Sequence, residues 1–86
     1  MYQLLFSDKA LKSLKTIQKK DAQRILSKID ELAANPNETP NVKKLANHPV
    51  AAYRLRVGDY RVLFDKEDEI RIIEIVDIGH RKDIYQ

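Results

Sequence analysis

The chain has 86 residues, no cysteine, and 16 lysine and arginine residues against 13 acidic ones, which gives a formal net charge of +3. This length predicts a single domain, 1–86, with a core too small for a dinucleotide cofactor. The lack of cysteine excludes disulfides and thiolate metal sites. The apolar runs are only a few residues long and the N-terminus lacks the features of a signal peptide, so we expect no contact with a membrane.

The first half of the chain predicts a strand followed by two helices. Tyr2–Phe6 is apolar at nearly every position, as in a buried strand. Ser7 is a candidate N-cap for a first helix, whose apolar residues recur at helical spacing up to Ile17. Asp21 is the candidate cap of a second helix, which ends at Asn35–Pro36 because a residue before proline avoids the helical conformation. The short link between them predicts an antiparallel helical hairpin.

The second half predicts a short strand and then an antiparallel meander. After a loop over 35–41, Val42–Leu45 is the candidate short strand. Segments rich in β-branched and aromatic residues predict three further strands, at Ala51–Val57, Tyr60–Asp65 and Ile70–Ile78. Gly58–Asp59 suits a two-residue type II′ turn, and Lys66–Glu69 forms a longer acidic turn. The expected fold is therefore α+β: an N-terminal strand, an antiparallel helical hairpin that covers one sheet face, and a three- to four-stranded antiparallel meander.

The two-residue turn also predicts the pairing of the hairpin, because it sets residue 57 opposite residue 60. Side chains alternate along a strand, so Arg54, Arg56 and Arg61 share one face, with Arg56 directly opposite Arg61. Like charges in that position are unfavourable by up to about 1 kcal/mol, which suggests that an absent polyanion supplies the opposite charge. Alternatively, the arginines are ordinary exposed groups that extend away from one another, with Glu74 of the next strand beside Arg61.

The C-terminal segment adds a fourth guanidinium group. The last strand is expected to end at Ile78, where Gly79 permits a sharp change of direction. Arg81 then supplies another planar fork suited to phosphate. Neither Ile84 nor Tyr85 is typical of a solvated tail, so one of them is expected to pack back on the sheet.

Clustered arginines bind phosphate through paired, charge-assisted hydrogen bonds. Cleavage of RNA by its own 2′-hydroxyl needs a phosphate held in line, neutralisation of the developing charge, a base and an acid, and it needs no metal. The two histidines and the scattered carboxylates lack metal-ligand spacing, and the chain has no Gly-rich phosphate loop. We therefore expect neither a metal nor a cofactor.

Two segments, YRLRVGDYRVLF at Tyr53–Phe64 and IIEIVDIGHRKDIY at Ile72–Tyr85, resemble the RelE branch of the RelE/ParE toxin superfamily. The resemblance covers nearly the whole chain, including the helix pair and Lys43–Leu45. It implies a small cytoplasmic toxin of a type II toxin–antitoxin pair, with a cognate antitoxin as its partner. RelE-type members enter the ribosomal A site and cleave mRNA there without a metal, so the ribosome and mRNA are further implied partners.

The resemblance also implies site residues. The implied catalytic residues are Arg56, Arg61, Arg81 and Tyr85, and we add His80 as a further candidate for proton transfer. The implied RNA-binding residues are Arg54, Lys43, Lys44 and Lys82. The best-studied RelE-type pattern has lysines at the positions of Arg54 and Arg56, and an arginine does not give up its proton. The general base is therefore open between His80 and Tyr85.

Two alternatives to a ribosome-dependent nuclease stay open. A ParE-like toxin would keep the fold, bind DNA gyrase and cleave no RNA. A relic domain would bind RNA with weak or absent catalysis. The Gly-His-Arg ending and the C-terminal tyrosine favour the RelE-like alternative, because a gyrase inhibitor does not need clustered phosphate-binding groups.

Overall fold

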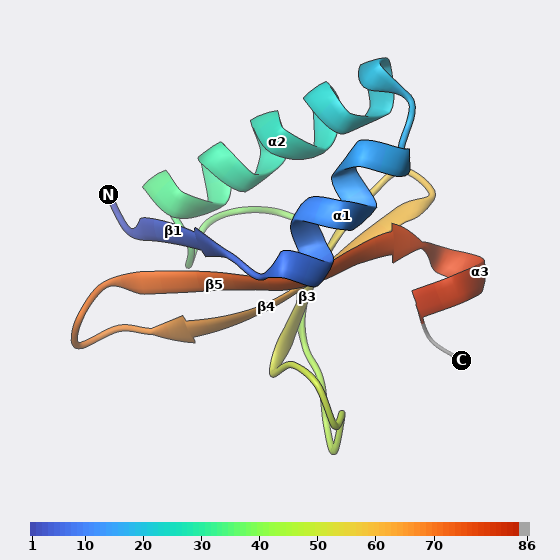
Figure 1. Cartoon of the computed structure of the whole chain (residues 1–86). Coiled ribbons are helices and arrows are strands. Elements are labelled where there is room, and N and C mark those ends of the chain that lie inside the picture. The colour runs from blue at the N-terminus through green and yellow to red at the C-terminus, as the bar shows by residue number, and fades with distance from the viewer. Residues whose placement is uncertain (85–86) are drawn as a thin grey trace.

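A computed structural model of the chain describes residues 1–84 and contains one five-stranded sheet with two long helices on one face (Figure 1). The strand order across the sheet is β1-β5-β4-β3-β2. The strands are β1 (Gln3–Phe6), β2 (Val42–Lys44), β3 (Tyr53–Val57), β4 (Tyr60–Glu67) and β5 (Ile72–His80). The first strand pairs in parallel with the last, and all other pairs are antiparallel. The predicted α+β architecture is confirmed.

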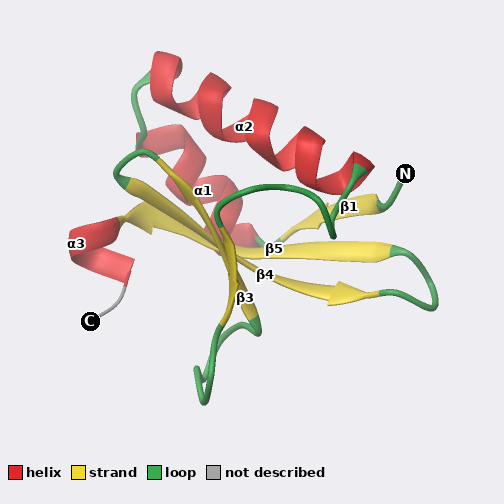
Figure 2. Ribbon diagram, turned by 180° about the vertical axis from the view of Figure 1, so that it is seen from behind, coloured by secondary structure: helices red, strands yellow, loops and turns green. Residues whose placement is uncertain are grey.

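The helical hairpin consists of α1 (Asp8–Thr16) and α2 (Lys19–Ala34), which lie on the same side of the sheet (Figure 2). Ser7 caps α1 as predicted: its Oγ accepts a hydrogen bond from the Ala10 N–H at 3.0 Å and donates one to the Val76 carbonyl at 2.6 Å. The second bond ties the start of α1 to β5.

The predicted cap of the second helix is wrong. Gln18 occupies the N-cap position of α2, and Asp21 lies in the first helical turn. The link between the helices is shorter than the charge pattern suggested, so α2 begins at Lys19. The negative charge of the Asp21 carboxylate, in the first turn of α2, still interacts favourably with the positive end of the helix dipole. The other end agrees with the prediction, because α2 ends before Asn35.

The core lies between the helices and one face of the central strands. Its fully or nearly fully buried members from the sheet are Leu55, Val57, Val62, Phe64, Ile73, Ile75 and Ile78. The helices contribute Ala10, Ile25, Ile29 and Leu32. Tyr53 extends this face by stacking on Phe64, with ring centroids 5.3 Å apart. The arginine-bearing face of the β3–β4 hairpin therefore points away from the core.

The predicted pairing of the β3–β4 hairpin is confirmed. Arg56 lies opposite Arg61, and Val57 opposite Tyr60. Gly58 has a φ of 59° and Asp59 is not among the residues with positive φ, as a Gly-first two-residue turn requires.

The ends of several strands differ from the predictions. β4 continues to Glu67 instead of Asp65, because the turn that follows lies two residues later and uses Arg71 at a φ of 55°. β5 consequently begins at Ile72 instead of Ile70. Glu74 then lies opposite Asp65 and Gly79 lies opposite Arg61, so the alternative that placed Glu74 beside Arg61 is wrong.

The two ends of the meander also differ. β3 begins at Tyr53 instead of Ala51, and β5 runs to His80 instead of ending at Ile78. The chain leaves the sheet after His80 and forms a short helix, α3 (Arg81–Ile84). The Ile84 side chain packs back on the sheet at Gly79, where a Cβ added to the glycine would lie 3.5 Å from it. Tyr85 lies outside the described residues. None of the helices within residues 1–84 is long and apolar enough to cross a membrane.

One hydrogen bond ties the N-terminus to the β4–β5 turn and predicts a pH dependence of stability. The Tyr2 hydroxyl donates to Asp68 Oδ1 at 2.7 Å. This bond raises the pKa of the Tyr2 hydroxyl and lowers the pKa of the Asp68 carboxyl. A lowered carboxyl pKa stabilises the fold above the ordinary aspartate range, and the contribution is lost as the pH falls through the lowered value.

Tyr2→Phe should therefore lower the urea midpoint of unfolding at neutral pH, and the difference from wild type should disappear in strongly acidic solution. Tyr53→Phe is the matched control, since within residues 1–84 the Tyr53 hydroxyl makes no hydrogen bond. A Tyr2→Phe difference that stays constant at every pH would contradict the role of Asp68.

Candidate phosphate-binding cleft

Five cationic side chains meet in an open cleft beside the β3–β4 turn. Arg56 comes from β3, Arg61 from β4 and Arg81 from the first position of α3, while α2 contributes Arg24 and Lys28. These five residues define the cationic cleft. The structure thus brings together three of the residues predicted from sequence and adds two from a helix.

Neutral groups or a distant carboxylate hold the three arginines from the sheet and α3 in place. Arg56 Nη2 donates to Asn41 Oδ1 at 3.3 Å. Arg61 Nη1 donates to the carbonyls of Gly58 and Tyr60, at 3.2 and 3.1 Å.

Arg81 is fixed mainly through its backbone. Its N–H donates to the Asp59 carbonyl at 2.8 Å, whereas its Nε lies 3.9 Å from the Asp59 carboxylate. Both side chains of that ion pair are largely exposed, so water screens the attraction. Most of the guanidinium donors remain free for a ligand.

The charge of the cleft is strongly unbalanced. Among residues 1–84, Asp59 is the one carboxylate that lines it, against five cations. Arg56 and Arg61 lie directly opposite each other on neighbouring strands, which is unfavourable without an anion between them. A bound phosphate group would relieve this repulsion and accept bidentate hydrogen bonds from the planar forks.

The implied RNA-binding residues lie elsewhere. Lys43 on β2 pairs with Arg54 on β3. Arg54 precedes Arg56 of the cleft by two residues. Lys44 is the neighbouring residue on β2, and Lys82 lies on α3, where both are exposed. None of these four lines the cleft. They are separate charges outside it.

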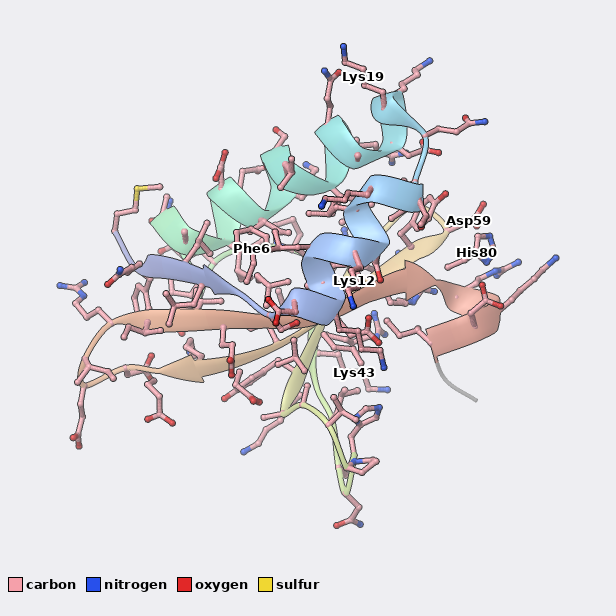
Figure 3. All side chains as sticks on the ribbon, viewed as in Figure 1. Phe6, Lys12, Lys19, Lys43, Asp59 and His80 are labelled. Atoms are coloured by element: carbon pink, nitrogen blue, oxygen red, sulfur yellow. The ribbon has the colours of Figure 1, made fainter. Side chains whose placement is uncertain are left out.

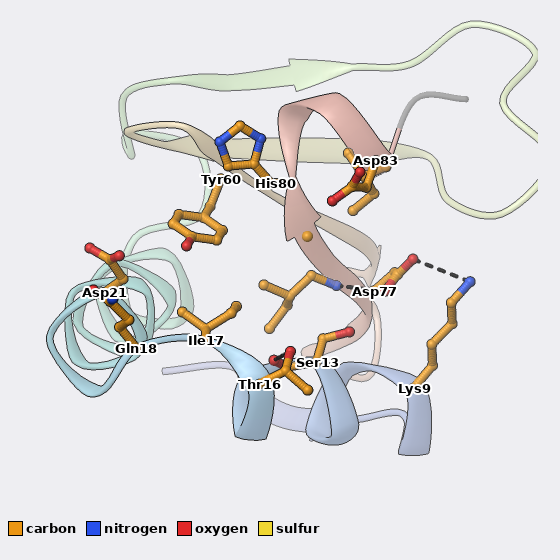
Figure 4. A pocket seen from close by; sticks show the side chains of 13 residues that line it. Lys9, Ser13, Thr16, Ile17, Gln18, Asp21, Tyr60, Asp77, His80 and Asp83 are labelled. Carbon is orange, nitrogen blue, oxygen red and sulfur yellow. Dashed lines mark hydrogen bonds and ion pairs between the residues drawn. The ribbon is translucent and has the colours of Figure 1, made fainter.

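His80 lies across the sheet from the arginines. It is opposite Tyr60 on the helix-covered face, with the two rings edge to face at 5.6 Å. Figure 4 shows both rings in the pocket between α1 and β5, where Lys9 and Asp77 form an ion pair at 3.3 Å. The alternation of side chains explains this placement, because Gly79 takes the arginine side. His80 also lines a smaller pocket that shares Arg24, Gly58 and Asp59 with the cationic cleft, and Figure 3 shows Asp59 and His80 at the same end of the sheet.

Sequence reasoning missed Arg24, Lys28 and Asn41. Arg24 is the one arginine in the first half of the chain, and Lys28 follows it four residues later. This spacing predicts that both lie on one face of the second helix. Their approach to the turn depends on how α2 crosses the sheet, for which the sequence carries no local signal. Within residues 1–84, no group of three His, Asp or Glu side chains is arranged to hold a metal ion.

A sequence model described as the ParE toxin of the type II toxin–antitoxin system parDE matches residues 4–85. The chain belongs to this toxin family. It is therefore a toxin of a type II toxin–antitoxin system. No curated protein sequence matched the chain.

Solved structures of RelE toxins share the fold. The archaeal RelE–RelB complex from Pyrococcus horikoshii is 27% identical with a TM-score of 0.79, over 95% of this chain and 97% of that one. The RelB–RelE complex from Methanococcus jannaschii is 29% identical with a TM-score of 0.72, over 95% of each chain. The intact E. coli RelBE complex is 23% identical with a TM-score of 0.76, over 93% of this chain and 96% of that one. At this identity, the similarity shows only that the two chains share a fold. With the family match, these similarities confirm the resemblance to the RelE branch of the superfamily.

The charge imbalance predicts stabilisation by anions. Sulfate at about ten times its Kd should stabilise the fold by about 1.4 kcal/mol, seen as a higher melting temperature than in chloride of equal ionic strength. Arg61→Gln should lose this increment, and Lys12→Gln, on the exposed side of α1 (Figure 3), should keep it. Sulfate also stabilises proteins generally, so an equal increment in all three proteins would show that the cleft binds no anion.

Proposed function

We propose that the protein is a ribosome-dependent, metal-independent endoribonuclease that cleaves mRNA in the ribosomal A site and so inhibits translation in the cytoplasm. The observation that supports this proposal is the convergence of Arg56, Arg61 and Arg81 on one exposed cleft without matching carboxylates among the described residues. The similarity to RelE toxins supports the choice of target.

The reaction is a transesterification in which the 5′-oxygen of the next nucleotide is the leaving group. The 2′-oxygen of one nucleotide bonds to the adjacent phosphorus, and the bond from phosphorus to the 5′-oxygen of the next nucleotide breaks. A base takes the 2′-hydroxyl proton and an acid gives a proton to the leaving oxygen, which leaves a cyclic phosphate and a 5′-hydroxyl. Negative charge grows on the phosphoryl oxygens, where Arg56, Arg61 and Arg81 neutralise it more strongly in the transition state than in the ground state.

His80 and Tyr85 share the proton transfers in this proposal, His80 from the smaller pocket that adjoins the cationic cleft at Arg24, Gly58 and Asp59. His80 Nδ1 accepts a hydrogen bond from the Lys82 N–H at 3.2 Å, so the proton of the neutral ring is on Nε2. To protonate the leaving oxygen, the His80 ring must carry a proton on both nitrogens, so the bond from the Lys82 N–H to Nδ1 must break in that step. Tyr85 is then the candidate base. Arg54, Lys43, Lys44 and Lys82 steer and hold RNA around the cleft.

Arg61→Ala and Arg81→Ala should each lower the cleavage rate by about 10²–10³-fold, the usual loss when one group that stabilises a developing oxyanion is removed. Primer extension on messages from induced cells, and on mRNA bound to purified ribosomes, measures the cuts. Lys12→Ala is the matched control for removal of one exposed charge. Equal cleavage by wild type and both arginine variants would refute the assignment.

The description of the family as parDE toxins favours one competing function, inhibition of DNA gyrase. Induction would then cause DNA damage before translation stops, and the arginine variants would remain toxic. A relic domain would instead bind RNA in a salt-sensitive manner and leave mRNA intact on ribosomes.

We also propose a cognate antitoxin that covers the cationic cleft or displaces α3, using an extended or helical segment with acidic residues. The solved RelE relatives that are complexes with RelB support such a partner. Co-expression should abolish growth arrest, and the antitoxin should copurify with the toxin. Replacing both Arg56 and Arg61 with glutamine should weaken the complex in a salt-dependent way; a complex that tolerates both changes would place the antitoxin elsewhere.

A further inference from the structure

The cationic cleft continues along α2 as a row of three side chains, Lys20, Arg24 and Lys28, spaced four residues apart. Four residues advance a helix by about 6 Å and return to nearly the same face, which is close to the spacing of successive phosphates on a nucleic-acid strand. We infer that this α2 row binds the phosphodiester backbone of the RNA strand beside the reacting phosphate. The inference rests on the proposed function and identifies the surface that holds the substrate strand.

Arg24 is placed at the junction between the row and the cleft. Its guanidinium covers Gly58 of the β3–β4 turn, with Nη1, Cζ and Nη2 at 3.1, 3.6 and 3.7 Å from the position that a Cβ would take. The side chain is exposed, and none of the ion pairs found in residues 1–84 involves it. A planar, uncompensated fork is thus held against the turn that carries Arg56 and Arg61.

Lys28 lines the same cleft, one helical turn further along α2. Its Nζ pairs with Glu31 at 3.0 Å, but both side chains are about half exposed, at 44% and 52%, so this pair is weak. A phosphate can replace the carboxylate without leaving a buried charge. Lys20 lies one turn before Arg24 and is exposed, so it extends the row away from the cleft.

The α2 row and the three arginines of the sheet and α3 have different roles. The row contacts phosphates that do not react, so its interactions are equal in the ground and transition states. Removing one of them should raise KM and leave kcat unchanged. Arg61, in contrast, acts on the reacting phosphate and should affect kcat.

The test measures binding of a single-stranded RNA oligonucleotide, with a 2′-O-methyl group at each position to prevent cleavage, by fluorescence anisotropy over a range of salt concentrations. Arg24→Gln and Lys28→Gln should each weaken binding about fivefold at about 0.1 M salt, and should each lower the slope of log K against log salt by about 0.7. Lys12→Gln and Lys15→Gln, on the exposed side of α1, are the matched controls. Equal losses in all four variants, or no loss in the α2 variants, would overturn the inference.

A second comparison tests the position of Arg24. Gly58→Asn is strained at this positive φ, although less than most substitutions, and its Cβ would lie 3.1 Å from Arg24 Nη1, so the guanidinium must move by a few tenths of an ångström. It should weaken RNA binding less than Arg24→Gln does, because the charge of Arg24 remains, and it should cause little further loss when Arg24 is already replaced by glutamine. Additive losses would show that Arg24 does not act from that place.

Failure of this inference and failure of the nuclease proposal are distinguishable. If the wild-type protein binds the oligonucleotide through the α2 row but leaves mRNA uncut on ribosomes, the inference about the α2 row is supported and the nuclease assignment is refuted. If the wild-type protein cuts mRNA and the α2 variants keep the wild-type KM, the nuclease assignment is supported and the inference about the α2 row is refuted.

Discussion

The two-residue turn between β3 and β4 is the constraint on which the rest of the site depends. Gly58 takes a left-handed conformation with a φ of 59°, and this lets the strands reverse without an extra residue. The resulting pairing puts Arg56 and Arg61 opposite each other on the same face. The missing side chain at Gly58 also leaves room for Arg24, so one residue determines both the local pairing and the approach of α2.

The helical hairpin stabilises one face of the sheet, and Arg56 and Arg61 project from the other face. Burial of Val57, Val62 and Ile78 beneath the helices holds β3, β4 and β5 in register. Repulsion among the cations is tolerated because this apolar core is separate from them. An anionic ligand that binds among these cations would relieve their repulsion, and this relief would contribute to its binding free energy.

Much of the fold was predictable from local patterns, and so was part of the cleft. The alternation along Tyr53–Val57 and the Gly58–Asp59 turn predicted the Arg56–Arg61 pair, and Ser7 marked the start of α1. The end of β5 was not predictable, because glycine at 79 suggested a break where the strand in fact continues opposite Arg61. Pairing across the sheet outweighed the local preference of that glycine.

The contributions of Arg24 and Lys28 were beyond local patterns for a different reason. Spacing showed that they share a helix face, but the crossing of α2 over the sheet depends on how Ile25 and Ile29 pack in the core. His80 is the opposite case: the pairing of His80 with Tyr60 follows once β5 is known to extend that far. The sheet face on which the His80 side chain lies was therefore not predictable, because the sequence left the end of β5 ambiguous.

The parallel pairing of β1 with β5 has a consequence for synthesis of the chain. The strand made first pairs with the strand made last, and Ser7 bonds to Val76, 69 residues further on. While β5 and α3 are still inside the ribosome that makes the chain, β1 lacks this neighbour and Arg81 has not reached the cleft. The cleft is therefore assembled late, only after β5 and α3 have emerged.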